Sequence, residues 1–264
     1  MVVRYDNRSN EQGVSESIGF MLIFTIVIAG IALVTLYGYP LLLQQQVGAE
    51  EKIMEKNMIV LQNDIKSLAY KTVPFKETSL KIGGGSMTVY NTSQSQIKIY
   101  SDPANPFVDS FKPGELRYES VSAQTDISLQ NGAVLMRPRN QPGSTMLAEP
   151  RWFYDVNPNT GETTMVINLI IITSDDIMAK EGIGTVRMKL GETSYNYTTG
   201  LGGHTIKLDY TSGSGQDYST AWTNYLTKTL NIPPPTTTAT KTTYSLPDID
   251  TLVIKRYEVK IEAI

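Results

Sequence analysis

The stretch that decides the fold runs from Glu16 to Glu50 and reads ESIGFMLIFTIVIAGIALVTLYGYPLLLQQQVGAE. The 33 residues between these two glutamates include no Asp, Glu, Lys, Arg or His, and nearly every position from Ile18 to Leu43 is apolar. As a helix, Ile18–Leu43 would span about 39 Å, more than the roughly 30 Å of hydrocarbon in a bilayer. We therefore expect one helix that crosses a membrane or lies in the core of an assembly.

The pattern then becomes amphipathic, with apolar residues every three or four positions, at Met54, Met58, Leu61, Ile65 and Leu68. This spacing predicts one helix from about Ser17 to Tyr70, apolar all round in its first half and amphipathic in its second. Pro40 lacks a backbone donor and is expected to interrupt the helix where it leaves the lipid. Tyr37 and Tyr39 beside it are residues typical of a membrane interface.

A patch of small residues, Ala29, Gly30 and Ala32, lies within the apolar half. Small side chains let a second helix approach closely in lipid, so the patch is a candidate helix-packing surface. Ordinary transmembrane composition explains the same residues equally well. Both interpretations stay open at the level of sequence.

Ahead of the apolar run the chain reads Gly13-Val14-Ser15-Glu16-Ser17-Ile18-Gly19-Phe20. A short hydrophilic segment followed by a charge-free helix and an amphipathic continuation resembles the N-terminus of archaeal type IV pilin-like proteins, the group that includes pilins and archaellins. Ser15, Ile18 and Gly19 are similar to the serine-x-x-isoleucine-glycine pattern at the start of that family's helix.

The resemblance implies that a prepilin-type peptidase removes Met1–Gly13 as a leader, or class III signal peptide. Gly13 would then precede the cut and Val14 would become the new N-terminus. It also implies that the mature helix is first a membrane anchor and later the core of a filament. The implied partners are membrane lipid, other copies of the chain through the N-terminal helix, the peptidase and the pilus assembly machinery.

Two features differ from the family's pattern. Glu11 and Gln12 stand where a basic residue commonly precedes the cut, and Glu16 stands where many archaeal pilins have proline. The alternative is an uncleaved signal anchor that holds a monomeric, membrane-tethered extracellular binding module. Two basic residues precede the apolar run and two follow it closely, so the positive-inside rule does not fix the orientation.

After Pro74 the periodicity changes from helical to alternating, which predicts an antiparallel β domain. The first expected strands contain Leu80-Ile82, Met87-Val89, Ile97-Ile99, Leu116-Tyr118, Ile127-Leu129 and Val134-Met136. Turn residues separate them, among them Gly83-Gly84-Gly85 and Asn131-Gly132, and the second of these is the clearest hairpin signal in the chain. Another hairpin is expected to join Arg151–Val156 to Thr163–Thr173.

The run Val166–Ile172 is apolar enough to predict a central strand buried on both faces, one of them covered by the amphipathic part of the long helix. The remaining expected elements are strands at Thr185–Leu190, Ser194–Thr198 and Thr205–Tyr210, a helix at Thr220–Leu230 capped by Ser219, an exposed Pro- and Thr-rich segment from Pro233 to Thr243, and a final strand within Asp250–Ile264.

Composition excludes several classes of function. The chain has 264 residues, a formal charge of −3 and no long Lys/Arg run, which gives no electrostatic footprint for a nucleic-acid partner. Cysteine is absent, so no disulfide or thiolate chemistry is available. Sequons at Asn91-Thr92-Ser93 and Asn196-Tyr197-Thr198 are candidate glycosylation sites of an extracellular glycoprotein.

No catalytic constellation is recognisable. His204 is the only histidine and has no cysteine with which to share a metal. Asp155–Glu162 superficially resembles a calcium loop, but its glycine is one position late and a proline interrupts it, which favours a plain turn. Asp175-Asp176 is expected to cap a helix through Met178, or to hold a cation, and Gly182-Ile183-Gly184 lacks a phosphate loop's third glycine. We expect no enzyme activity, no cofactor and no metal.

The sequence thus predicts an α+β protein in which a single long N-terminal helix packs on a mainly antiparallel β domain. The expected divisions are residues 1–13 as leader, 14–72 as transmembrane and amphipathic helix, and 73–264 as extracellular β-rich domain. The expected location is the cell membrane, with a single pass, or a surface filament.

Overall fold

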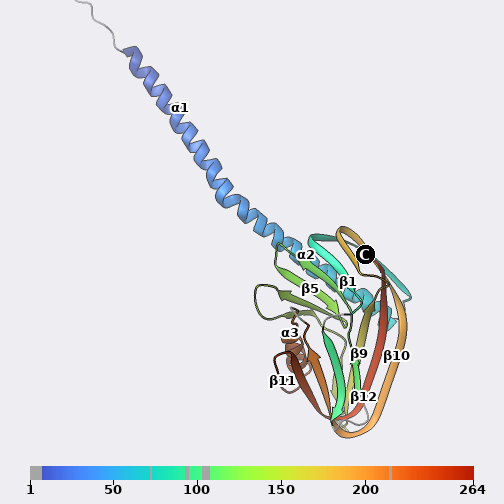
Figure 1. Ribbon diagram of the computed structural model, residues 1–264. Coiled ribbons are helices and arrows are strands. Elements are labelled where there is room, and N and C mark those ends of the chain that lie inside the picture. Colours follow the sequence, from blue (N-terminus) through green and yellow to red (C-terminus); the bar gives the residue numbers. More distant parts are fainter. Residues whose placement is uncertain (1–7, 72, 93–94, 103–107, 214–215) are drawn as a thin grey trace, which may run out of the picture. The chain divides into compact units, whose positions relative to one another are not determined.

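The structure, a computed structural model, describes residues 8–71, 73–92, 95–102, 108–213 and 216–264 (Figure 1). The chain separates into two compact units, Met1–Ala49 and Glu50–Ile264. The described residues of the first unit are helical, and all strands that the structure describes lie in the second unit. The predicted α+β class is confirmed.

The N-terminal helix is α-helical except for one wider turn. It consists of α1 (Arg8–Leu33), a π-helical turn (Val34–Gly38) and α2 (Tyr39–Lys71). The backbone amide of Tyr39 donates to the carbonyl of Val34, five residues earlier, just before Pro40, which has no amide to donate. The predicted interruption at Pro40 is therefore a single π turn, after which the helix continues.

The second unit is built on a 12-stranded sheet with the order β7-β6-β5-β4-β1-β10-β12-β9-β8; β2 joins β10 and β3, and β11 joins β12. The strands are β1 (Phe75–Tyr90), β2 (Gln96–Asp102), β3 (Val108–Phe111), β4 (Glu115–Ser120), β5 (Thr125–Gln130), β6 (Ala133–Pro138), β7 (Thr145–Ala148), β8 (Phe153–Val156), β9 (Thr163–Thr173), β10 (Met178–Thr211), β11 (Thr236–Thr237) and β12 (Lys241–Ala263).

The sheet is antiparallel except where β12 runs parallel to β9. β10 and β12 are long neighbouring strands that curve together along the sheet (Figure 1). Three separate strands were expected between Thr185 and Tyr210, but β10 is one strand. Register shifts near Gly191 and between Thr199 and His204 take up the irregular positions without ending the pairing to β12.

The triple glycine is not the predicted turn. Gly83–Gly85 lies inside β1, where the register with β10 shifts between Ile82 and Met87. Gly84 has φ +67°, and a side chain at Gly85 would overlap the backbone carbonyl of Glu119. The glycines form a bulge that brings the second half of β1 against β4.

Both predicted hairpins are confirmed. Asn131 and Gly132 have φ values of +47° and +71° and join β5 to β6, as expected for a type I′ turn. β8 pairs with β9 through the turn that contains Pro158.

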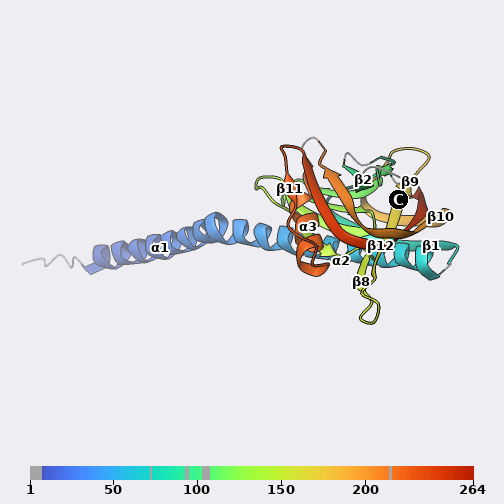
Figure 2. The ribbon, with the colours of Figure 1, turned by 90° about the horizontal axis from the view of Figure 1, so that it is seen from below.

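Two apolar cores lie on opposite faces of β9. Ile167 and Leu169 belong to the core that contains Trp152 and Trp222, whereas Ile170 and Ile172 belong to the core lined by α2. The second core includes Ala69 of α2 and five larger α2 residues with 0% exposure, Met54, Met58, Leu61, Ile65 and Leu68. In Figure 2 this part of α2 runs along the strands. The central strand and its helical cover are as predicted.

Two capping predictions are wrong. α3 (Ser219–Asn224) and a π turn (Tyr225–Thr229) occupy the predicted helix, but Ser219 is its first residue, and the carboxylate of Asp217 accepts a hydrogen bond from the Ser219 amide at 2.8 Å. Asp175-Asp176 caps no helix, because the chain enters β10 at Met178. Asp175 instead pairs with the ammonium of Lys260 at 2.6 Å.

The Pro- and Thr-rich segment is not exposed along its whole length. Thr236–Thr237 forms the short exposed strand β11, which pairs with Thr242 and Thr243 of β12. Thr242 is 4% exposed. The predicted exposed segment therefore ends inside the sheet, because β12 begins at Lys241.

Candidate functional site

The first candidate surface is the apolar helix. The large apolar side chains between Ile18 and Leu43 expose between 43% and 72% of their surface. Within the part of the chain that the structure describes, one helix, Glu16–Lys71, is long and apolar enough to cross a membrane. A continuous apolar surface of this size is typical of a segment that contacts lipid or other protein. The helix is compatible with a membrane anchor.

The small-residue patch is open on this helix. A side chain placed on Gly30 would meet no atom within 4 Å. Ala29 and Ala32 are also exposed. The patch therefore has the flat surface that close helix packing needs, and its role in packing stays a prediction.

The backbone of the two predicted processing residues, Gly13 and Val14, belongs to α1, which begins at Arg8 rather than near the expected Ser17. Their side chains lie outside the described set, as does the structure of Met1–Asn7. Their role in processing stays a prediction.

The two sequon asparagines occupy different settings. Asn91 follows β1, and its side-chain oxygen accepts a hydrogen bond from the Ser174 amide at 2.6 Å. Asn196 lies in β10 opposite Ile254 and is exposed. Ser93, the third residue of the first sequon, lies outside the described residues. Glycosylation stays a prediction at both positions.

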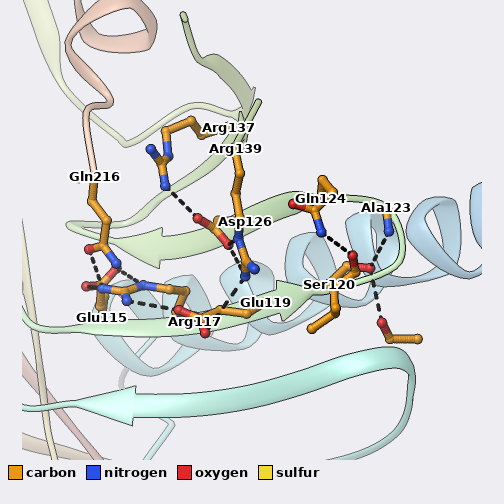
Figure 3. Close-up of polar contacts among 12 residues, drawn as sticks. Glu115, Arg117, Glu119, Ser120, Ala123, Gln124, Asp126, Arg137, Arg139 and Gln216 are labelled. Carbon is orange, nitrogen blue, oxygen red and sulfur yellow. Dashed lines mark hydrogen bonds and ion pairs between the residues drawn. The ribbon is translucent and has the colours of Figure 1, made fainter. Parts of the chain in front are cut away.

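A buried ion-pair network on β4, β5 and β6 was not found from the sequence (Figure 3). Arg117 on β4 forms ion pairs with Glu115 and Glu119, and its guanidinium lies 4.5 Å from the ring centre of Tyr90. Asp126 on β5 pairs with Arg137 at 2.7 Å and with Arg139 at 2.6 Å. Glu115, Arg117 and Asp126 are at most 4% exposed.

The charged groups of this network are paired with one another, which is typical of a structural role. Burial by itself lowers the pKa of Arg117, but the hydrogen bonds that Arg117 donates to Glu115 and the negative charge of Glu115 outweigh burial and raise this pKa above its usual value. The hydrogen bond that Arg139 donates to Asp126 raises the pKa of Arg139. The hydroxyl of Ser128 donates to Glu115 at 2.6 Å. Three carboxylates and three guanidinium groups thus neutralise one another, an arrangement that fixes strand positions.

The sequence carried a signal for this network that was easy to misread. Glu115, Arg117 and Glu119 alternate with Leu116 and Tyr118, a pattern typical of a strand with one wet face. The structure buries both faces of this strand. The close mixture of opposite charges on alternate positions was the available clue.

The other residues considered from the sequence as catalytic or metal-binding candidates do not lie together in one site. Among the described residues, no group of three or more His, Asp or Glu side chains could hold a metal ion. His204 lies at an irregular position in β10, and its Nδ1 atom is buried without a hydrogen-bond partner among the described residues. Asp155–Glu162 is an exposed hairpin turn, in which the side-chain oxygen of Asn157 accepts a hydrogen bond from the Asn159 amide at 3.0 Å. Gly182–Gly184 lies within β10.

A groove of about 750 Å³ opens in the Glu50–Ile264 unit beside the C-terminal end of α2. It is bounded by the α2 residues Lys66 and Tyr70, by the segment Glu149–Phe153 and by the turn after α3. Arg151 lies between two rings, with its guanidinium carbon 5.0 Å from the ring centre of Tyr70 and 5.6 Å from that of Phe153. This aromatic and cationic surface was also missed, because its residues are far apart in the sequence.

Comparisons with known proteins place the chain in one family. A model of the family described as "Family of unknown function (DUF7289)" matches residues 12–262. A protein of Archaeoglobus fulgidus, described as uncharacterized, is 22% identical over 248 residues, which cover 80% of this chain and 78% of that protein. No solved structure matches the chain. With nearly its whole length covered, the chain belongs to the family of unknown function DUF7289.

Proposed function

We propose that the protein is a membrane-anchored, pilin-like surface protein without enzymatic activity, which serves as a subunit of, or an accessory to, an archaeal type IV pilus-like filament. Membrane lipid surrounds its apolar helix before assembly, and copies of the same helix surround it afterwards. The proposed partners are therefore lipid, further copies of the chain, a prepilin-type peptidase and the assembly machinery, and nucleic acid is not among them.

One observation carries this proposal. The sheet and the Met54–Leu68 stripe of α2 complete a core of their own, whereas the apolar side chains from Ile18 to Leu43 remain uncovered. Water is a costly environment for such a surface, since burial of each CH₂ group stabilises by about 0.8 kcal/mol. A segment of this kind needs either a bilayer or a bundle of like helices, and a pilin helix uses both in turn.

The processing test compares the native chain with a Gly13→Leu variant, with Gly48→Leu as the matched control. Gly48 is also a helical glycine, and a Cβ atom placed there would meet no atom of a neighbouring residue within 4 Å. Mass spectrometry of the N-terminus should find Val14 in the native and control proteins and Met1, or the residue after it, in the Gly13 variant. Electron microscopy of cells should show filaments that contain the chain and that the Gly13 variant lacks.

A native N-terminus at Met1 would contradict the filament proposal. It would favour the alternative of a monomeric binding module on an uncleaved anchor. A purified full-length chain that is soluble and monomeric without detergent would contradict both.

A further inference from the structure

The segment Glu149–Phe153 is held rigidly at the end of α2. The Glu149 carbonyl accepts hydrogen bonds from Gln62 at 2.9 Å and from Lys66 at 3.2 Å. The indole of Trp152, 3% exposed, donates to the Asn168 carbonyl at 2.9 Å. With Trp152 anchored in the core, its neighbours Arg151 and Phe153 are fixed in exposed positions. The guanidinium of Arg151 and the ring of Phe153 are thus held in place before a ligand binds.

Tyr70, Arg151 and Phe153 separate two hollows. The 750 Å³ groove lies on one side, and a smaller hollow of about 230 Å³, bounded by Asn168 and Lys255 among others, lies on the other. All three residues border both hollows. A ligand that crosses this ridge would contact two aromatic rings and a guanidinium at once.

The charges around the hollows are mostly of one sign. Lys66, Lys71, Arg151 and Lys255 border them, with Glu149 as the one carboxylate of their walls. None of these four cations forms an ion pair with another described residue, although basic residues elsewhere on the domain, such as Arg187, Lys189, Lys241 and Lys260, do. On a chain with a net charge of −3 this is a local concentration of unpaired positive charge.

Aromatic side chains continue this surface across the sheet. One row of paired residues crosses β8, β9, β12 and β10 through Phe153, Val166, Val253 and Tyr197. A second row, two residues further along, crosses β9, β12 and β10 through Asn168, Lys255 and Tyr195. Phe153, Tyr197 and Tyr195 are 46%, 60% and 78% exposed. Three strand spacings separate Phe153 from Tyr197, about 14 Å. We call Tyr70, Arg151, Phe153, Lys255, Tyr195 and Tyr197 the basic aromatic face.

We propose that the basic aromatic face binds an acidic polysaccharide, a chain of sugar rings that carry carboxylates. The apolar faces of sugar rings stack on exposed aromatic rings, and Arg and Lys side chains pair with the carboxylates. The row of rings and cations is long enough for several sugar units. An acidic peptide fits less well, because extended peptides are typically bound through the backbone of a sheet edge, and this surface is made of side chains on a sheet face.

The electrostatic surroundings of Lys66 also favour a negatively charged ligand. Burial, followed by the positive charge of Arg151, lowers the pKa of Lys66, and only Glu149 opposes the shift. An anion in the groove would relieve this repulsion. The proposal does not depend on leader cleavage or filament assembly, so it can fail while the proposed function holds.

The test is calorimetric titration of the full-length chain in detergent micelles with tetragalacturonate, with neutral maltotetraose and poly-glutamate as comparison ligands. We expect tetragalacturonate to bind and maltotetraose to give no signal. Lys255→Gln and Phe153→Ala should each weaken tetragalacturonate binding about tenfold. The matched controls are Lys98→Gln and Phe75→Ala, which change an exposed lysine and a phenylalanine of 44% exposure away from this face. They should leave the affinity within about twofold.

Three results would overturn the proposal. The first is no binding of tetragalacturonate at millimolar concentration. The second is an equal loss in the Lys98→Gln control, which would indicate diffuse charge attraction. The third is tight poly-glutamate binding that Phe153→Ala leaves unchanged, which would assign the face to acidic peptides. Arg151→Gln should reduce tetragalacturonate binding as strongly as Lys255→Gln, with unchanged near-ultraviolet circular dichroism as the check on folding.

Discussion

The two halves of the N-terminal helix are built from similar apolar residues but solve different problems. Between Ile18 and Leu43 the large side chains are all exposed, whereas the Met54–Leu68 stripe is completely buried against the sheet. The second half carries charged residues on its remaining surface, and the Ile18–Leu43 stretch carries none. The β domain therefore includes the amphipathic half in its core, while the large apolar side chains from Ile18 to Leu43 stay exposed.

Among the changes considered, Arg117→Leu in the buried ion-pair network of the β domain should lower stability the most. This change leaves Glu115, 1% exposed, without its ion-pair partner. The free energy of unfolding should fall by about 3–5 kcal/mol. Denaturant unfolding followed by tryptophan fluorescence measures this loss, because both tryptophans, Trp152 and Trp222, lie in the buried core.

Arg187→Leu is the matched control. Arg187 pairs with Glu77 at 3.3 Å, but both side chains are nearly half exposed. Its loss should cost at most about 1 kcal/mol. Equal losses in the two variants would show that the buried network contributes no more than a surface pair.

The next test makes the same change in both halves of the helix. Leu61→Ala removes a fully buried side chain and should lower the free energy of unfolding by about 2–5 kcal/mol. Leu22→Ala changes a side chain that is 58% exposed and should leave the fluorescence-detected transition unchanged in detergent. A shift of similar size for Leu22→Ala would mean that the apolar half contributes to the core of the domain.

Sequence patterns predicted the elements that depend on local chemistry. The helical stripe, the Asn131-Gly132 hairpin and the doubly buried β9 each follow from periodicity or turn preference within a few residues. The predictions failed where a distant strand decides the outcome. Gly83–Gly85 became a bulge because β1 pairs with both β10 and β4, and Asp175 lost its expected helix because the chain joins β10.

Neither the buried ion-pair network nor the basic aromatic face of the β domain could be predicted from local sequence patterns. The polar face of β4 looks wet in sequence, but Arg117 pairs there with Glu115 and Glu119 of the same strand, and Arg137 and Arg139 pair with Asp126 on the neighbouring β5. The basic aromatic face joins Tyr70 of α2, Arg151 of the segment before β8 and Tyr197 of β10. Such long-range pairings leave no local period. The apolar helix could be predicted because its signal lies in one uninterrupted stretch.

Alkaline pH should destabilise the β domain. Burial raises the pKa of Tyr244 to about 12 from its usual 10.0. Below pH 10 both folded and unfolded states keep this proton, so stability is unaffected. Between pH 10 and 12 only the unfolded state releases it, so stability falls by roughly 1.4 kcal/mol per pH unit for this group.

Burial also raises the pKa of Tyr210 and Tyr218, which adds to the loss in the same direction. Denaturant unfolding at several pH values measures the slope. Tyr244→Phe should make the slope shallower by about one proton, although it also removes the 2.8 Å hydrogen bond to Thr223 and lowers stability at neutral pH. A slope that is the same in both proteins would contradict the assignment.

The smallest expected effect concerns Gly30. A methyl group there meets no atom within 4 Å, so Gly30→Ala should leave the unfolding of the β domain unchanged. If the patch with Ala29 and Ala32 packs helices together, the methyl group should weaken self-association in bilayers by about 1 kcal/mol or less. Energy transfer between labelled chains in vesicles measures this change, with Gly48→Ala, outside the Ile18–Leu43 stretch, as the control. Equal association of all three proteins would leave the apolar helix as an anchor whose small residues have no packing role, because a helix in lipid gains nothing from a glycine that no neighbour approaches.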